Sequence, residues 1–213
     1  MNDFRLTQSY LLCQMNDKGK LASGTPQFAL GIATLLELLQ NDCITINKEM
    51  VLKSPPPKDL CYLTEVYQFM QGKKTRKLDK MMSDVCFSDK LLKNVKNSCC
   101  ETLVEQGYFS QTTTKGLFDS SKTRFIPKTE SQDLLIETIR SAVLSGGVIS
   151  GNTAVLISLL EKSGKLKEYF SKHEKTQLKS CIKELRTNKE CQLVFRWIEQ
   201  IEEFYVTVIC CPK

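Results

Sequence analysis

Histidine and cysteine are the residue types in this sequence best suited to covalent or metal chemistry. The single histidine, His173, has no sequence neighbours that would complete a catalytic triad. The ten cysteines form no CxxC pair and lie in no known nucleophile motif, and the HExxH, GxxxxGKS/T and GxGxxG motifs do not occur. We therefore predict a protein that is not an enzyme, has no metal site and needs no cofactor.

Packing explains the cysteines better than chemistry does. Cys99, Cys181 and Cys191 fall within amphipathic helical patterns, where cysteine acts as a small hydrophobic residue. The first residues show no basic segment followed by an apolar core, so no secretory signal is indicated. We expect reduced thiols in a protein that stays on the cytosolic side.

Basic residues are in surplus, and the formal net charge is +6. Several of them lie in one short segment, namely Lys73, Lys74, Arg76, Lys77 and Lys80. Such a segment attracts nucleic acid or the anionic cytoplasmic leaflet of a membrane, where each basic residue near the surface contributes about 1 kcal/mol. A solvated lysine-rich loop is the simpler alternative.

Apolar residues recur at three- and four-residue spacing through most of the chain, which predicts amphipathic helices. Between residues 27 and 41, for example, Phe28, Ile32 and Leu36 share one face. Helices are expected at 27–41, 59–71, 75–82, 88–106, 130–145, 152–162, 165–171, 173–187 and 190–208, and a short helix or strand at 6–15.

Two short regions have the character of β-hairpins. Ile44–Ile46 and Met50–Leu52 flank a polar turn. Further along, Leu117–Phe118 and Phe125–Ile126 flank a second polar turn at 119–122. Both regions are therefore expected to pair as small antiparallel sheets.

Composition supports one folded unit. Hydrophobic residues make up 41% and charged residues 25%, which is typical of a globular protein. The longest apolar stretches fall far short of the roughly 20 residues that a transmembrane helix needs. We predict a mainly α fold: residues 1–213 form a single compact multi-helix domain with two small β-hairpins, ending in a tail at 209–213.

Four stretches of the sequence occur in a recognisable order. Leu6–Leu12 is similar to an "LT…LLL" opening, Thr34–Leu38 to an "LLIELAL" helix, Leu103–Phe109 to "LVEKGVL", and Leu117–Leu144 to "LFD…P…AVL". In this order and spacing they resemble the Golgi phosphoprotein 3 family over about 6–208.

That resemblance implies a function as well as a fold. Members of the family are predominantly helical adaptors that bind phosphatidylinositol 4-phosphate on the cytosolic face of the Golgi. They link the cytosolic tails of Golgi enzymes, such as glycosyltransferases, to the retrograde vesicle coat. We therefore expect a peripheral membrane protein with these partners, and a homo-oligomer is a further option. Longer members contact the coat through a basic N-terminal arm, and the short stretch before Leu6 is not such an arm, which weakens the expectation of coat binding.

The resemblance also implies a lipid headgroup site. Lys93 and Lys96 match two basic family residues, and their spacing places both on one helix face, where two ammonium groups can meet a phosphate. The family's tryptophan and arginine are missing, and Gly31 stands where the arginine would align. Lys18 or Lys20 is a candidate substitute. The alternative is that Lys93 and Lys96 form only the solvated edge of a helix.

The second hairpin carries more apolar surface than a solvated turn needs. Leu117, Phe118, Phe125 and Ile126 are therefore predicted to contact a membrane or another subunit. Folding of these side chains back onto the core is the alternative.

A basic nucleic-acid-binding protein of the winged-helix type is the alternative function, because a helix followed by a small hairpin at 27–52 is the local pattern of that fold. The supposed recognition helix, from Phe28 to Asn41, contains no lysine or arginine. Contact with phosphate is not expected there, and nucleic acid is not an expected partner.

Overall fold

The computed structural model describes residues 4–46, 49–74, 77–115, 121–146, 149, 151–189, 191–192, 195–197 and 199. Its helices are α1 (Leu6–Gln14), α2 (Thr25–Gln40), α3 (Thr64–Gln71), α4 (Leu78–Cys86), α5 (Asp89–Glu105), α6 (Thr129–Leu144), α7 (Gly151–Lys162) and α8 (Lys175–Leu185), with 3-10 helices η1 (Lys58–Leu63) and η2 (Leu166–Tyr169). Its strands are β1 (Ile44–Ile46), β2 (Met50–Leu52), β3 (Phe109–Lys115) and β4 (Ser121–Pro127). The predicted fold class, mainly α with two small antiparallel hairpins, is confirmed.

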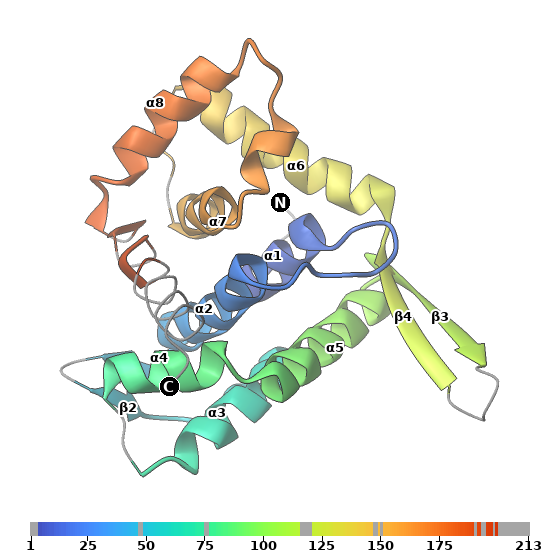
Figure 1. The fold of residues 1–213 in the computed structure, drawn as a ribbon, viewed down its shortest axis with the longest axis vertical. Helices are drawn as coiled ribbons and strands as arrows, with labels where there is room; N and C mark the ends of the chain where they lie inside the picture. Colours follow the sequence, from blue (N-terminus) through green and yellow to red (C-terminus); the bar gives the residue numbers. More distant parts are fainter. Residues whose placement is uncertain are drawn as a thin grey trace, which may run out of the picture.

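Helix α1 lies at the centre of the molecule, between α6 and α7 on one side and α2 and α5 on the other (Figure 1). All nine of its residues are buried, as expected for a helix that is surrounded on every side. Two of its polar side chains bond to neighbouring elements. Gln8 Nε2 donates to Thr102 Oγ1 on α5 at 3.3 Å, and Gln14 Nε2 donates to Ser163 Oγ just after α7.

A buried carboxylate fixes the start of α1. Glu37 on α2 is 1% exposed, and its oxygens accept hydrogen bonds from the Thr7 backbone N–H at 3.0 Å and from the Tyr62 hydroxyl at 2.9 Å. Burial raises the pKa of this carboxyl, and the hydrogen bonds from Thr7 and Tyr62 oppose that shift. A buried carboxyl group needs such partners, and the hydrogen bonds join α1, α2 and η1.

The first hairpin matches its prediction: Ile44 pairs with Leu52 and Ile46 with Met50. The second hairpin differs in its first strand, which was placed at Leu117–Phe118. In the structure β3 starts at Phe109, because Gly107 (φ 84°) turns the chain out of α5 at once. Thr112 and Thr113 in β3 are exposed, and threonine suits a strand. Leu117 and Phe118 lie outside the described residues.

The helices predicted in two further stretches can be compared with the structure. The single helix expected at 59–71 is a 3-10 helix followed by α3, with Pro57 as the residue before its first turn. Much of the helix predicted at 190–208 lies outside the described residues, but Trp197 is 0% exposed and therefore packs onto the domain. Cys99, Cys181 and Cys191 are buried, as predicted. Over the residues described, no helix is long and apolar enough to cross a membrane.

Candidate anion-binding site

The loop after α1 is a tight turn that carries Lys18 and Lys20. Asn16 Oδ1 accepts hydrogen bonds from the backbone N–H groups of both lysines, at 3.0 and 2.9 Å. Gly19 lies between them with φ 68°, and a Cβ at this position would be only 2.4 Å from the carbonyl oxygen of Phe125 on β4. Glycine thus supplies both the left-handed conformation and the close approach, and the turn packs directly against β4.

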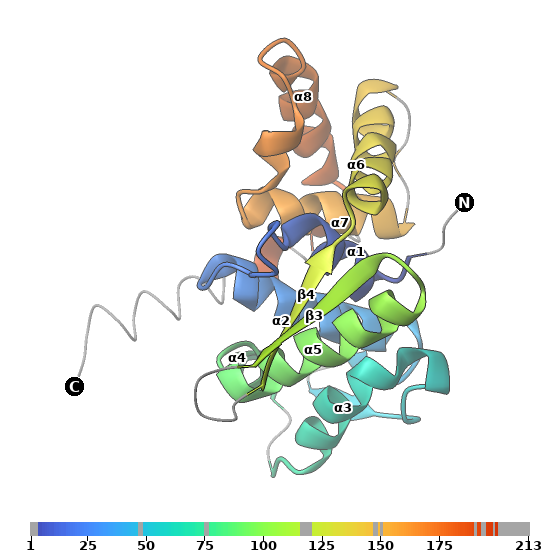
Figure 2. The same ribbon diagram turned by 90° about the vertical axis from the view of Figure 1, so that its right-hand side faces the viewer.

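Helix α5 supplies the two lysines that the sequence singled out. The hairpin β3–β4 starts beside the C-terminal end of this helix and contacts it (Figure 1 and Figure 2). Lys93 is exposed and Lys96 is half-buried, and both face the space between α5 and the hairpin. The structure therefore brings the predicted pair to the same place as the Lys18–Lys20 turn.

Strand β4 adds Arg124, which the sequence analysis did not single out. It is exposed and pairs across the hairpin with Thr112. Because β4 buries Phe125 and Pro127, alternation places Arg124 on the opposite side from these two residues. That alternation was legible in the sequence, but the position of α5 and the turn beside the strand was not.

These three segments surround one cavity of about 670 Å³, which we call the basic hollow. Its cationic lining residues are Lys18, Lys20, Lys93, Lys96 and Arg124, and Glu101 is the carboxylate among its lining residues. None of these six side chains takes part in an ion pair with another described residue. Uncompensated positive charge around a hollow favours an anion.

The basic segment at 73–80 is arranged differently. Lys73 and Lys80 each lie 2.9 Å from a carboxylate oxygen of Asp84, and the Lys73 ammonium lies 4.3 Å from the centroid of the Phe69 ring. Burial opposes ionisation of Asp84, but hydrogen bonds from Lys80 and Lys73 outweigh it and lower the pKa of this carboxyl. We call these three charged residues the Asp84 cluster. Arg76 lies outside the described residues.

Comparison with known families identifies the chain. The Golgi phosphoprotein 3 (GPP34) family profile matches residues 6–199. The chain belongs to the Golgi phosphoprotein 3 family. No individual curated protein matches it.

In this member of the Golgi phosphoprotein 3 family, the backbone at Gly31 leaves little room for a side chain. A Cβ at position 31 would lie 2.9 Å from the Cys86 sulfur and 3.2 Å from the Cys86 Cα. This part of α2 therefore packs tightly on α4, and Gly31 does not line the basic hollow. The hollow has Lys18, Lys20 and Arg124 as further cations instead.

The hairpin residues predicted to contact a membrane or another subunit differ in how deeply they are buried. Phe125 is 6% exposed and belongs to the hydrophobic core, so the expectation of an exposed ring is wrong. Phe125 belongs to the core cluster, while its backbone packs against the Gly19 turn and β4 packs on α5. Ile126 is half-buried, and Leu117 and Phe118 lie outside the described residues.

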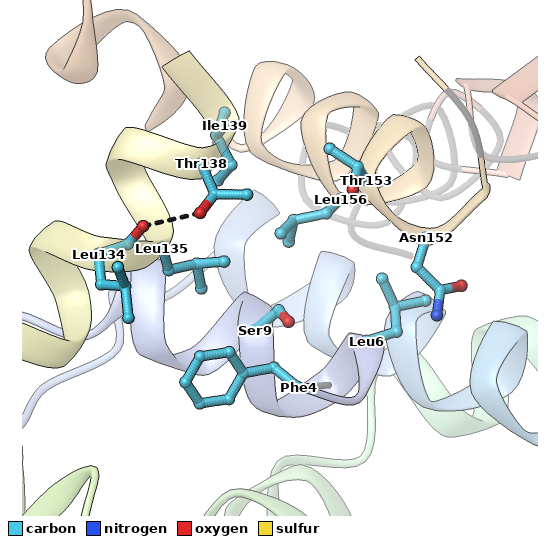
Figure 3. Close-up of a pocket in the computed structure, with 10 residues that line it drawn as sticks. All are labelled: Phe4, Leu6, Ser9, Leu134, Leu135, Thr138, Ile139, Asn152, Thr153 and Leu156. Atoms are coloured by element: carbon cyan, nitrogen blue, oxygen red, sulfur yellow. Dashed lines mark hydrogen bonds between the residues drawn. The ribbon is translucent and has the colours of Figure 1, made fainter. Parts of the chain in front are cut away.

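A second hollow in this family member has the opposite chemistry. It has a volume of about 450 Å³ and lies between α1, α6 and α7 (Figure 3). Its lining is Phe4, Leu6, Ser9, Leu134, Leu135, Thr138, Ile139, Asn152, Thr153 and Leu156. Leu134 is 54% exposed at its edge, and no charged side chain is among these lining residues. This apolar hollow is therefore unsuited to phosphate.

Proposed function

We propose that the protein is a peripheral membrane adaptor, not an enzyme, that binds phosphatidylinositol 4-phosphate on the cytosolic face of the Golgi. In this proposal it helps to retain or sort Golgi membrane proteins such as glycosyltransferases. Membership of the Golgi phosphoprotein 3 family supports an association with the Golgi. The observation that carries lipid binding is the basic hollow, where five cations gather with no ion-pair partner among the described residues.

The two kinds of cation in the hollow suit a phosphate monoester in different ways. The Arg124 guanidinium can donate two parallel hydrogen bonds to phosphate oxygens, whereas each lysine supplies a compact point charge. Since Lys93 and Arg124 are exposed, each contribution is moderated by water, at about 1 kcal/mol per residue near an anionic surface. Binding therefore depends on several cations acting together.

The winged-helix alternative is disfavoured by the position of α2. A recognition helix must present an exposed face to nucleic acid, but α2 is buried from Phe28 to Leu38. The same stretch has no basic residue. Nucleic acid is therefore not part of this proposal.

The protein partners in the proposal rest on family membership. They are the cytosolic tails of Golgi enzymes and the retrograde vesicle coat, and self-association into a homo-oligomer is an additional element. The apolar hollow between α1, α6 and α7 supplies no charged group for these contacts, so it does not enter the proposal.

Vesicle flotation tests the lipid-binding step. The protein should float with phosphatidylcholine vesicles that contain phosphatidylinositol 4-phosphate and remain below with phosphatidylcholine alone, at about 0.15 M salt, where the Debye length is about 8 Å. A soluble inositol phosphate as competitor shows whether the headgroup alone suffices. Equal flotation with both vesicles, or equal binding to a nucleic-acid duplex, would contradict the proposal.

A further inference from the structure

One carboxylate lines the basic hollow together with the five cations. Glu101 lies on α5 eight residues after Lys93, with Asn97 midway between them, and all three residues line the hollow. Residues four apart share a helix face, and each such step rises about 6 Å. The α5 wall of the hollow therefore changes from positive through neutral to negative over about 12 Å.

Glu101 is not used to neutralise the hollow. No ion pair joins it to a cation in the part of the chain that the structure describes, although Lys96 lies only five residues before it on α5. Its side chain is exposed, so its charge faces the solvent of the hollow. The hairpin contributes neutral donors and acceptors from Gln111 and Thr123 to the same lining.

We propose that Glu101 determines which headgroups the hollow accepts, selecting a single phosphate monoester on a polyhydroxylated ring over rings with a second phosphate. This inference rests on the proposed lipid binding. With one phosphate at the lysines, ring hydroxyls lie toward Asn97 and Glu101, and a hydroxyl can donate a hydrogen bond to the carboxylate. A second phosphate in that position meets a like charge, which is an effective means of excluding a competing ligand.

The test measures vesicle binding of wild type, Glu101→Gln and Glu105→Gln. Vesicles contain phosphatidylcholine with either phosphatidylinositol 4-phosphate or phosphatidylinositol 4,5-bisphosphate. Glu105 is a matched control, because it is exposed, lies one turn further along α5 and does not line the hollow. Thermal unfolding of all three proteins verifies that the fold is kept.

Wild type should prefer the monophosphate, and Glu101→Gln should raise binding of the bisphosphate by about fivefold relative to the monophosphate. Glu105→Gln should leave this ratio unchanged. An equal gain for both lipids, an unchanged ratio, or the same shift in Glu105→Gln would overturn the role of Glu101 while leaving the lipid site in place. Absence of wild-type binding to either vesicle would instead remove the proposed function and this inference with it. Free inositol phosphates as competitors should reproduce the ratio, because the selection acts on the headgroup.

Discussion

The Asp84 cluster and the basic hollow both contain several basic side chains, but they use the charge differently. In the Asp84 cluster, the carboxylate accepts from Lys73 and Lys80 at 2.9 Å each. In the basic hollow, five cations surround about 670 Å³ and have no ion-pair partner among the described residues. The first arrangement satisfies its charges internally, and the second leaves them for a ligand.

This difference indicates that local charge density in a sequence does not show which basic residues lack a carboxylate partner in the fold. The basic segment at 73–80 is the densest run, yet two of its lysines serve the fold. The hollow draws its cations from three separated segments, at 18–20, 93–96 and 124, none of which is conspicuous alone. What distinguishes the two regions is the presence or absence of an intramolecular carboxylate partner.

The largest effect is expected at the wall of the hollow. Phe125→Ala removes a ring that is 6% exposed, and it should lower the free energy of unfolding by about 3–5 kcal/mol. Chemical denaturation measures the loss. Ile126→Ala is the control and should cost clearly less, since Ile126 is half-buried. A loss no larger than for Ile126→Ala would show that Phe125 is not a core residue.

The second largest loss of stability is expected at the contact between the Gly19 turn and β4. Gly19→Ala places a Cβ 2.4 Å from the Phe125 carbonyl oxygen at a positive φ, so the free energy of unfolding should fall by about 2–4 kcal/mol. Gly164 also has positive φ (77°) but nothing within 4 Å of an added Cβ. Gly164→Ala should therefore cost only about 1–2 kcal/mol. Denaturation of both variants measures the difference, and equal losses would mean that the turn does not press on the strand.

A substitution of the α5 lysines tests the hollow as a ligand site. Lys93→Gln/Lys96→Gln should weaken binding to vesicles with phosphatidylinositol 4-phosphate by about 2 kcal/mol, or roughly 30-fold, with little change in stability. The matched control is Lys175→Gln/Lys179→Gln, which makes the same change of charge at two exposed positions of α8. If both double variants lose binding equally in flotation, attraction is a property of net charge and not of the hollow.

The smallest effect is expected in the Asp84 cluster. Asp84→Asn should lower the free energy of unfolding by about 1 kcal/mol at neutral pH, because Lys80 is largely exposed. Since the pKa of Asp84 is lowered from its ordinary 3.8 in the fold, this stabilisation is present above that value and is lost as the pH falls through the folded-state pKa. Denaturation at several pH values should show the two proteins converging in acid. Vesicle binding should be unchanged. A large loss of binding would mean that the Asp84 cluster also takes part in binding vesicles.

Regular patterns made much of the fold predictable. Period-3.6 spacing located α2 and α5, and the hairpin of β1 and β2 followed from its two β-branched or apolar runs around a polar turn. The start of β3 is not predictable from apolar alternation, because Ser110–Thr114 contains no apolar residue, whereas Leu117–Phe118 is more apolar.

The candidate site was only half predictable. Lys93 and Lys96 were found through family resemblance, and Lys18 and Lys20 were named as candidate substitutes. Arg124 was missed because its part in the hollow depends on the contact of Gly19 with β4, which is tertiary. The burial of Phe125 in the core is likewise tertiary, so the sequence leaves open whether this ring contacts a membrane or subunit or folds back onto the core.

Trp197 gives the protein an internal optical reporter. It is the single tryptophan of the sequence and it is fully buried, so native emission should be that of an indole shielded from water, shifting to the red when this side chain is exposed. Trp197 lies in the C-terminal part of the chain and is not among the residues that line the basic hollow. Fluorescence can therefore follow the exposure of Trp197 separately from events at the lysines of the basic hollow, without any added label.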